Sequence, residues 1–182
     1  CACRGTAGFV HVSCLAEQAK ILRVEAEENN LGVKAFDERW RRWDSCSLCE
    51  QQYHGVVYCA LGWACWKTYV GRPEADACRK SAMNQLGKGL NDAGHDGYAL
   101  IVKEAELAIH RRLGAPESHL LTVQANLACT LDELGRYEEA LPMKRDVHSG
   151  HARLFGEEAS ITLISANNYA SCLVKLKRFE EA

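Results

Sequence analysis

The fold of this chain is decided by the stretch Asn126-Leu-Ala-Cys-Thr-Leu-Asp-Glu-Leu-Gly-Arg-Tyr-Glu-Glu-Ala140, which returns 42 residues later as Asn168-Tyr-Ala-Ser-Cys-Leu-Val-Lys-Leu-Lys-Arg-Phe-Glu-Glu-Ala182. A weaker copy, Leu86 to Ala99, precedes the first by 41 residues. A fixed period of this size is typical of a solenoid of stacked helix pairs, because one pair alone cannot bury its apolar face.

Within one unit, the spacing of apolar residues predicts two helices joined by a turn. Gly135 suits the left-handed backbone that ends the first helix, and the second helix is expected to run from Tyr137 to Leu154. Pro142 lacks the N–H that an interior helical residue donates, so we expect a local kink or a late helix start there. The apolar face of the first helix is made by Leu127, Leu131 and Leu134.

These residues resemble tetratricopeptide repeats (TPRs), in the longer form found in kinesin light chains and nephrocystin-like proteins. The resemblance covers about residues 78–182, or about 2.5 repeats, and the last copy breaks off at Ala182. It implies an α-solenoid whose groove binds a peptide or protein partner. On first helices, Asn126, Asn167 and Asn168 could hold a peptide backbone, or they could be capping or solvated polar residues.

The beginning of the chain carries paired metal-ligand residues. They are Cys1 with Cys3, His11 with Cys14, and Cys46 with Cys49. Each spacing lets two side chains reach one tetrahedral metal ion. Ten cysteines in short pairs within a helix-rich chain favour metal over disulfides, and hence a reducing, cytoplasmic location.

This order of pairs resembles the RING-CH (RING-variant) zinc finger, a two-zinc cross-brace. The resemblance implies that Cys1, Cys3, Cys46 and Cys49 hold one zinc ion, whereas His11 and Cys14 are half of a second site. The other half would lie upstream of residue 1, so we expect the finger to be truncated at its N-terminus.

The RING-CH resemblance also implies a function. Such a finger docks a ubiquitin-conjugating enzyme and primes its thioester without a covalent intermediate, and the repeats would recruit the substrate. Two alternatives stay open. One is a non-catalytic scaffold or adaptor that uses the finger as a docking block, and the other is a kinesin-light-chain-like cargo adaptor, which leaves the finger unexplained.

The predicted domain order is a partial finger at 1–54, a connecting apolar helix at 55–77 and TPR-like repeats at 78–182. The finger contains a helical insert at about 15–43, where Asn29–Gly32 separates two apolar stripes. The stripes are Leu15, Ala19 and Leu22, then Phe36, Trp40 and Trp43. The run Val56–Trp66 is shorter than the ~20 residues of a membrane span, so we expect a buried helix there, with an interfacial helix as the alternative.

Several classes of function are disfavoured by composition and motifs. Charged residues make up 25% of the chain and the net charge is -2, so no broad basic field invites nucleic acid. We find no glycine-rich phosphate loop, HExxH motif or nucleophile elbow, and therefore assign no catalytic residue. We predict that the remaining cysteines are small buried residues rather than replacements for the missing zinc ligands: Cys59, Cys65, Cys78, Cys129 and Cys172.

Overall fold

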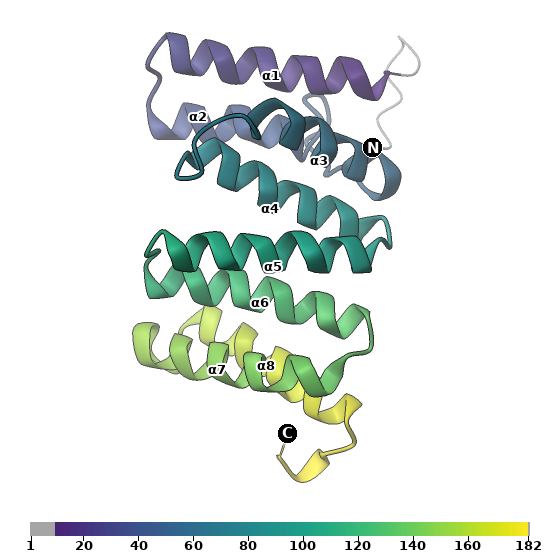
Figure 1. Ribbon diagram of the computed structural model, residues 1–182, viewed down its shortest axis with the longest axis vertical. Helices are drawn as coiled ribbons and strands as arrows, with labels where there is room; N and C mark the ends of the chain where they lie inside the picture. Colours follow the sequence, from purple (N-terminus) through teal and green to yellow (C-terminus); the bar gives the residue numbers. More distant parts are fainter. Residues whose placement is uncertain (1–9, 182) are drawn as a thin grey trace. The chain divides into compact units, whose positions relative to one another are not determined.

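The computed structural model describes residues 10–181, which are mostly α-helical (Figure 1). This confirms the predicted fold class at the level of a mostly α chain. The elements are α1 (Val12–Glu28), α2 (Val33–Trp40), η1 (Arg41–Trp43), α3 (Gly55–Tyr69), α4 (Ala77–Asp92), α5 (Asp96–Arg112), α6 (Glu117–Glu133), α7 (Tyr137–Phe155), α8 (Ser160–Lys175) and η2 (Phe179–Glu181).

The chain divides into two compact units. One ends at Ala99 and the other begins at Leu100, within α5. The predicted domain boundaries after residues 54 and 77 stay predictions, although α3 begins at Gly55 and α4 at Ala77. None of the described helices is long and apolar enough to cross a lipid bilayer.

In the first unit, the segment between Cys14 and Cys46 folds as α1, α2 and η1, and α1 and α2 form a hairpin (Figure 1). The apolar stripes give this hairpin its inner face, and Trp43 is completely buried. The Trp43 ring meets the Tyr69 ring edge-on, with centroids 6.3 Å apart. The buried core of this unit is formed by Ala19, Trp43, Cys46, Tyr53, Leu61, Cys65, Tyr69, Cys78 and Ala82.

Glycine lets α3 and α4 pack backbone against backbone. A Cβ atom added at Gly89 would lie 2.9 Å from the main-chain oxygen of Tyr58 and 3.0 Å from the Cα of Cys59. One added at Gly62 would lie 3.1 Å from the main-chain oxygen of Gln85. Because each glycine faces the backbone of the other helix, no side chain can move aside to make room. The apolar sequence of α3 is therefore a packing surface for α4.

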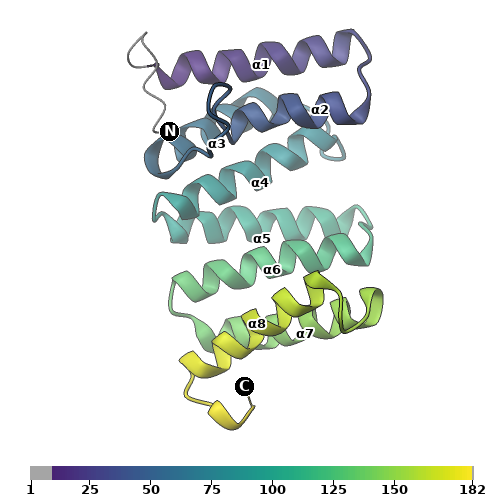
Figure 2. The same cartoon turned by 180° about the vertical axis from the view of Figure 1, so that it is seen from behind.

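In the second unit, α6 packs on α7 and α7 packs on α8 (Figure 2). The predicted left-handed residue between α6 and α7 is confirmed, since Gly135 has φ +72°. Leu127 and Leu131 are buried as predicted, whereas Leu134 is 36% exposed. The buried core of this unit is formed by Leu100, Leu107, Val123, Leu127, Leu131, Ala140, Leu141, Cys172 and Leu173.

Of the two outcomes expected at Pro142, a local kink or a late helix start, the late start does not occur. Helix α7 begins at Tyr137 and carries Pro142 in its interior. Proline costs the helix one main-chain hydrogen bond, but the flanking residues Ala140 and Leu141 are buried in the core. Burial of these neighbours outweighs the lost bond, and Pro142 itself faces solvent.

Candidate metal centre and repeat surface

Cys46 and Cys49 lie on one tight turn. The turn is closed by an isolated antiparallel bridge between Ser45 and Gln52, and the Cys46 N–H donates to the main-chain oxygen of Gln51 at 2.9 Å. The Glu50 N–H donates back to the main-chain oxygen of Cys46 at 3.0 Å, and Glu50 has φ +56°. The Cys-x-x-Cys spacing thus becomes a loop that carries both thiols on one structural unit.

The Cys46 sulfur accepts a main-chain hydrogen bond within its own turn. The Leu48 N–H lies 3.4 Å from the Cys46 sulfur and is directed at it, and such a donor stabilises the ionised sulfur that binds metal. Tyr53, buried beside the turn, has its pKa raised to about 12, chiefly by burial and further by the charge that Cys46 carries when it is ionised. The turn is therefore anchored in the core at one end.

His11 and Cys14 lie together at the start of α1. His11 occupies the N-cap position, and its side chain makes no capping hydrogen bond. Both residues are exposed, whereas their neighbours Val12 and Leu15 pack against the core cluster that contains Cys46. The structure thus places both residues on one helical turn. The His11 ring does not cap the helix.

The donor set on the Cys46–Cys49 turn fits two of the four ligands of a tetrahedral zinc ion. The predicted partners Cys1 and Cys3 lie outside the described residues. Among residues 10–181, no three side chains of histidine, cysteine, aspartate or glutamate gather closely enough to hold a metal ion. The complete four-cysteine site therefore stays a prediction, as does the half site at His11 and Cys14.

The remaining cysteines are free thiols. Cys59, Cys65, Cys78 and Cys172 are buried as predicted, and burial raises the pKa of Cys65, which leaves this thiol unreactive at neutral pH. The prediction is wrong for Cys129, which is exposed on α6. A helical cysteine is buried only if its side chain lies on the packed face, and Cys129 lies on the outer one.

Two buried lysines recur at equivalent positions of the repeats in the second unit. The ammonium group of Lys103, on α5, donates to the main-chain oxygen of Asn126 at 3.3 Å and to the Thr130 hydroxyl at 2.7 Å. That of Lys144, on α7, donates to the main-chain oxygen of Asn168 at 3.2 Å and to the carboxylate of Asp132. Each lysine therefore ties a second helix to the first helix of the next repeat.

The sequence contained a signal for these lysines, because they are 41 residues apart and thus match the period of the repeat. Lysine is rarely buried unless it is paired, so its appearance on an inner face is not expected from hydrophobic patterning. A repeated polar residue within an apolar face would have been the clue. Lys103 and Lys144 are each only 5% exposed.

Helices α6 and α8 present equivalent outer stripes. The two helices are linked within the second unit, where Lys175 on α8 lies 3.4 Å from the Asp132 carboxylate on α6. At an offset of 42 residues, both helices expose the same positions, and the asparagine of each is partly exposed. We call this set the outer stripe: His119, Thr122, Asn126, Cys129 and Glu133 on α6, and Ile161, Ile164, Asn168, Ser171 and Lys175 on α8.

Asn126 and Asn168 lie at the centre of the outer stripe, whereas the third predicted residue, Asn167, does not belong to it. Asn167 is exposed one position away from Asn168 along α8, about 100° around the helix. The main-chain oxygens of Asn126 and Asn168 accept from the two buried lysines. These bonds fix the main chain at the two asparagines.

Comparison with solved structures shows the kind of solenoid this chain forms. The nearly identical TPR-like repeats of a protein named as a kinesin light chain, from Podosopora anserina, align with a TM-score of 0.58 and 19% identity, over 95% of this chain and 72% of that chain. BtubC (BKLC) from P. vanneervenii aligns with a TM-score of 0.59 and 16% identity, over 91% of this chain and 65% of that chain. A variant of the first protein gives a TM-score of 0.56 and 17% identity, over 95% of this chain and 91% of that chain.

These likenesses establish a TPR-like helical fold and confirm the repeat part of the predicted resemblance. At sequence identities this low, the likenesses support a conclusion about the fold and not about the function. No family model matches the chain, and no curated protein matches it. The RING-CH part of the resemblance receives no support from these comparisons and stays a prediction.

Proposed function

We propose that this chain is a protein-binding adaptor whose outer stripe holds an extended segment of a partner protein. The observation that supports this is the recurrence of a partly exposed asparagine at the centre of equivalent stripes, Asn126 on α6 and Asn168 on α8. An asparagine side chain offers both a donor and an acceptor, which is the complement of a peptide group. Two of them, one repeat apart, can bind the backbone of a segment regardless of its sequence.

The surroundings of the two asparagines add to this proposal. The buried lysines hold the main chain of each asparagine, so little backbone entropy is lost when a ligand binds there. Beside Asn168, Ile164 is 62% exposed and Ile161 is 38% exposed, and they offer apolar contact for side chains of the segment. Backbone bonds would supply affinity and the isoleucines would supply selectivity.

The proposal predicts that replacing both stripe asparagines weakens binding. A peptide selected from a random library against the full chain is labelled, and its dissociation constant is measured by fluorescence anisotropy. We expect the double variant Asn126→Ala/Asn168→Ala to bind about 10-fold or more weakly, because hydrogen bonds worth about 1 kcal/mol each are lost at two sites. Asn167→Ala is the matched control and should bind like the original chain.

Equal affinity of the double variant and the original chain would refute the outer stripe as the binding surface, provided that both have the same thermal midpoint. The library screen should include kinesin heavy-chain segments. Binding of such a segment would assign a cargo-adaptor role, in keeping with the names of the structural neighbours.

A second candidate function is ubiquitin transfer, in which a zinc finger of RING-CH type docks a ubiquitin-conjugating enzyme and the repeats recruit substrate. The arrangement of Cys46 and Cys49 on one turn, with the Leu48 N–H directed at the first sulfur, favours this candidate. Zinc held by Cys1, Cys3, Cys46 and Cys49 would fix the turn as a rigid docking surface. Active fingers of this type commonly carry a cationic residue after the last cysteine, whereas this chain has Glu50 and Gln51 there.

This candidate predicts one zinc ion per chain and its loss in Cys46→Ser. Zinc content is measured by mass spectrometry of the purified protein, with Cys129→Ser, an exposed thiol outside the predicted site, as the matched control. Autoubiquitination with a panel of conjugating enzymes should disappear in Cys46→Ser and persist in Cys129→Ser. Activity that survives in Cys46→Ser would show that the predicted finger does not supply it. The absence of activity with every enzyme of the panel would contradict the ligase candidate.

A further inference from the structure

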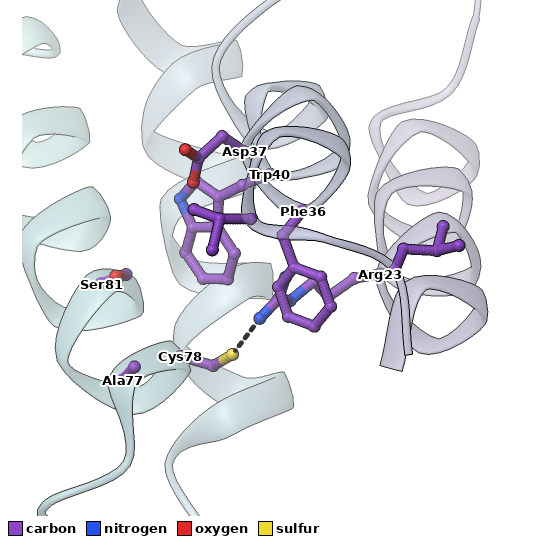
Figure 3. Close-up of a pocket in the computed structure, with 9 residues that line it drawn as sticks. Arg23, Phe36, Asp37, Trp40, Ala77, Cys78 and Ser81 are labelled. Atoms are coloured by element: carbon purple, nitrogen blue, oxygen red, sulfur yellow. Dashed lines mark hydrogen bonds between the residues drawn. The ribbon is translucent and has the colours of Figure 1, made fainter. Parts of the chain in front are cut away.

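The first unit contains a pocket of about 370 Å³ between α1, α2 and α4 (Figure 3). It takes no part in the predicted zinc site or in the outer stripe. Its wall combines a guanidinium, two aromatic rings, a thiol, a carboxylate and a hydroxyl. These belong to Arg23, Phe36, Trp40, Cys78, Asp37 and Ser81.

The guanidinium of Arg23 is the unusual member of this wall, because it is buried with few polar partners. Arg23 is 6% exposed, and its carbon Cζ lies 3.3 Å from the centroid of the Phe36 ring. Nη2 donates to the sulfur of Cys78 at 2.9 Å (Figure 3), which is a weak acceptor. Nε has no hydrogen-bond partner among the described residues.

The carboxylate that pairs with Arg23 is shared with a second arginine. The ion pair of Arg23 within the described chain is with Glu27, whose Oε1 lies 3.7 Å from Nη2, beyond hydrogen-bond distance. Both oxygens of Glu27 accept from Arg72, at 2.9 and 2.8 Å. These bonds to Arg72, more than the charge of Arg23, lower the pKa of Glu27. The Glu27 carboxylate, which is the ion-pair partner of Arg23, therefore makes its hydrogen bonds to Arg72 instead.

We propose that this pocket binds a monocarboxylate attached to an aromatic or aliphatic group. A buried guanidinium with an unused N–H is a strong donor for a carboxylate, since charge-assisted bonds of this kind are stronger than neutral ones. The rings of Phe36 and Trp40 provide the apolar surface for the rest of the ligand, and the volume lies in the range of small-molecule sites. Asp37, exposed in the same wall, disfavours a second negative charge on the ligand.

The carboxylate could belong to a free organic acid or to the C-terminus of a peptide, and both present the same group to Arg23. The test uses 3-phenylpropionate and its neutral counterpart 3-phenylpropanamide. A short peptide ending in a free phenylalanine carboxylate and its amidated form are the second pair. Each is titrated into the full chain, and the indole N–H signal of Trp40 is followed by NMR.

We expect each acid to bind about 10-fold or more tightly than its amide. Arg23→Met should remove this preference, whereas Lys20→Met, which removes an exposed cation of the same helix outside the pocket, should keep it. Asp37→Asn should strengthen binding of the acid about 3-fold, because a negative charge in the same wall is removed. Tighter binding of the peptide pair would identify a peptide terminus as the source of the carboxylate, and tighter binding of the small acid would identify a free metabolite.

Equal binding of acid and amide would overturn the proposal. A Trp40 indole signal that neither the acid nor the amide changes would also overturn it. The comparison of acid with amide is made on the original chain, so it remains decisive even if Arg23→Met fails to fold. A preference for the acid that persists in folded Arg23→Met would equally overturn the assignment to Arg23.

Discussion

Replacing Lys144 with methionine is expected to lower the free energy of unfolding by about 3–5 kcal/mol. Lys144 and Asp132 are buried partners, with side chains 5% and 10% exposed. Methionine keeps the length of the side chain but leaves the Asp132 carboxylate in the interior without its main counter-charge. It also removes the donor to the main-chain oxygen of Asn168. The variant should thus loosen α8 from α7.

Urea unfolding followed by circular dichroism measures this loss, and hydrogen exchange locates it in α6, α7 and α8. Lys175→Met is the matched control. Lys175 lies 3.4 Å from the same carboxylate but is 41% exposed, so its removal should cost less than about 1 kcal/mol. The double variant Lys144→Met/Asp132→Leu should recover much of the stability, because it removes both charges together. A Lys144→Met variant as stable as Lys175→Met would contradict the buried-pair interpretation.

Replacing Gly89 with alanine should destabilise the first unit by about 2–3 kcal/mol. An alanine in a helix is ordinarily more stable than a glycine by about 1 kcal/mol, so the sign of the effect is diagnostic. At Gly89 the added methyl group meets the main chain of Tyr58 and Cys59, and α3 must move away from α4 to admit it. The close helix contact then loses dispersion energy along its whole length.

Gly97→Ala provides the matched control, because a Cβ atom there would meet nothing within 4 Å and the residue also lies in a helix. It should be neutral or slightly stabilising. Thermal unfolding of the two variants, measured side by side, separates the effect of packing from the intrinsic preference of the helix. If Gly89→Ala melts at or above the temperature of Gly97→Ala, the backbone contact between α3 and α4 is not important for stability.

The helices of the second unit could be predicted closely from the sequence. The 42-residue period, the leucine spacing in α6 and the glycine at Gly135 are local signals, and they correspond to α6, the turn and α7. The separate apolar stripes on either side of Asn29–Gly32 likewise correspond to α1 and α2. Local patterns work here because a helix is stabilised by residues three and four positions apart.

Pro142 and Cys129 show what local reasoning could not decide. A proline predicts a break only when no other force holds the helix, and burial of Ala140 and Leu141 supplied that force. Cys129 lies on α6, whose buried face is determined by packing against α7. A shift of one residue along such a helix changes whether a cysteine is buried or exposed. The residue type alone did not contain this information.

Three pairs of zinc ligands are predicted from the sequence, and two of these pairs lie within the described residues. The Cys46–Cys49 turn and the His11–Cys14 helical turn are local features, so spacing was enough to predict that each pair lies on one turn, and metal binding by either pair stays a prediction. The union of Cys46 and Cys49 with Cys1 and Cys3 depends on residues outside the described range, and it stays a prediction that metal analysis can test.

By itself, the sequence determined that this protein is a helical repeat chain with cysteine pairs near its start, because periodicity, caps and ligand spacings act over a few residues. Only the tertiary structure decided which polar groups are buried together. Lys144 with Asp132, and Arg23 with Cys78, join residues on different helices. Burying a charge is costly unless a partner is near, and the three-dimensional packing alone determines which partners are near.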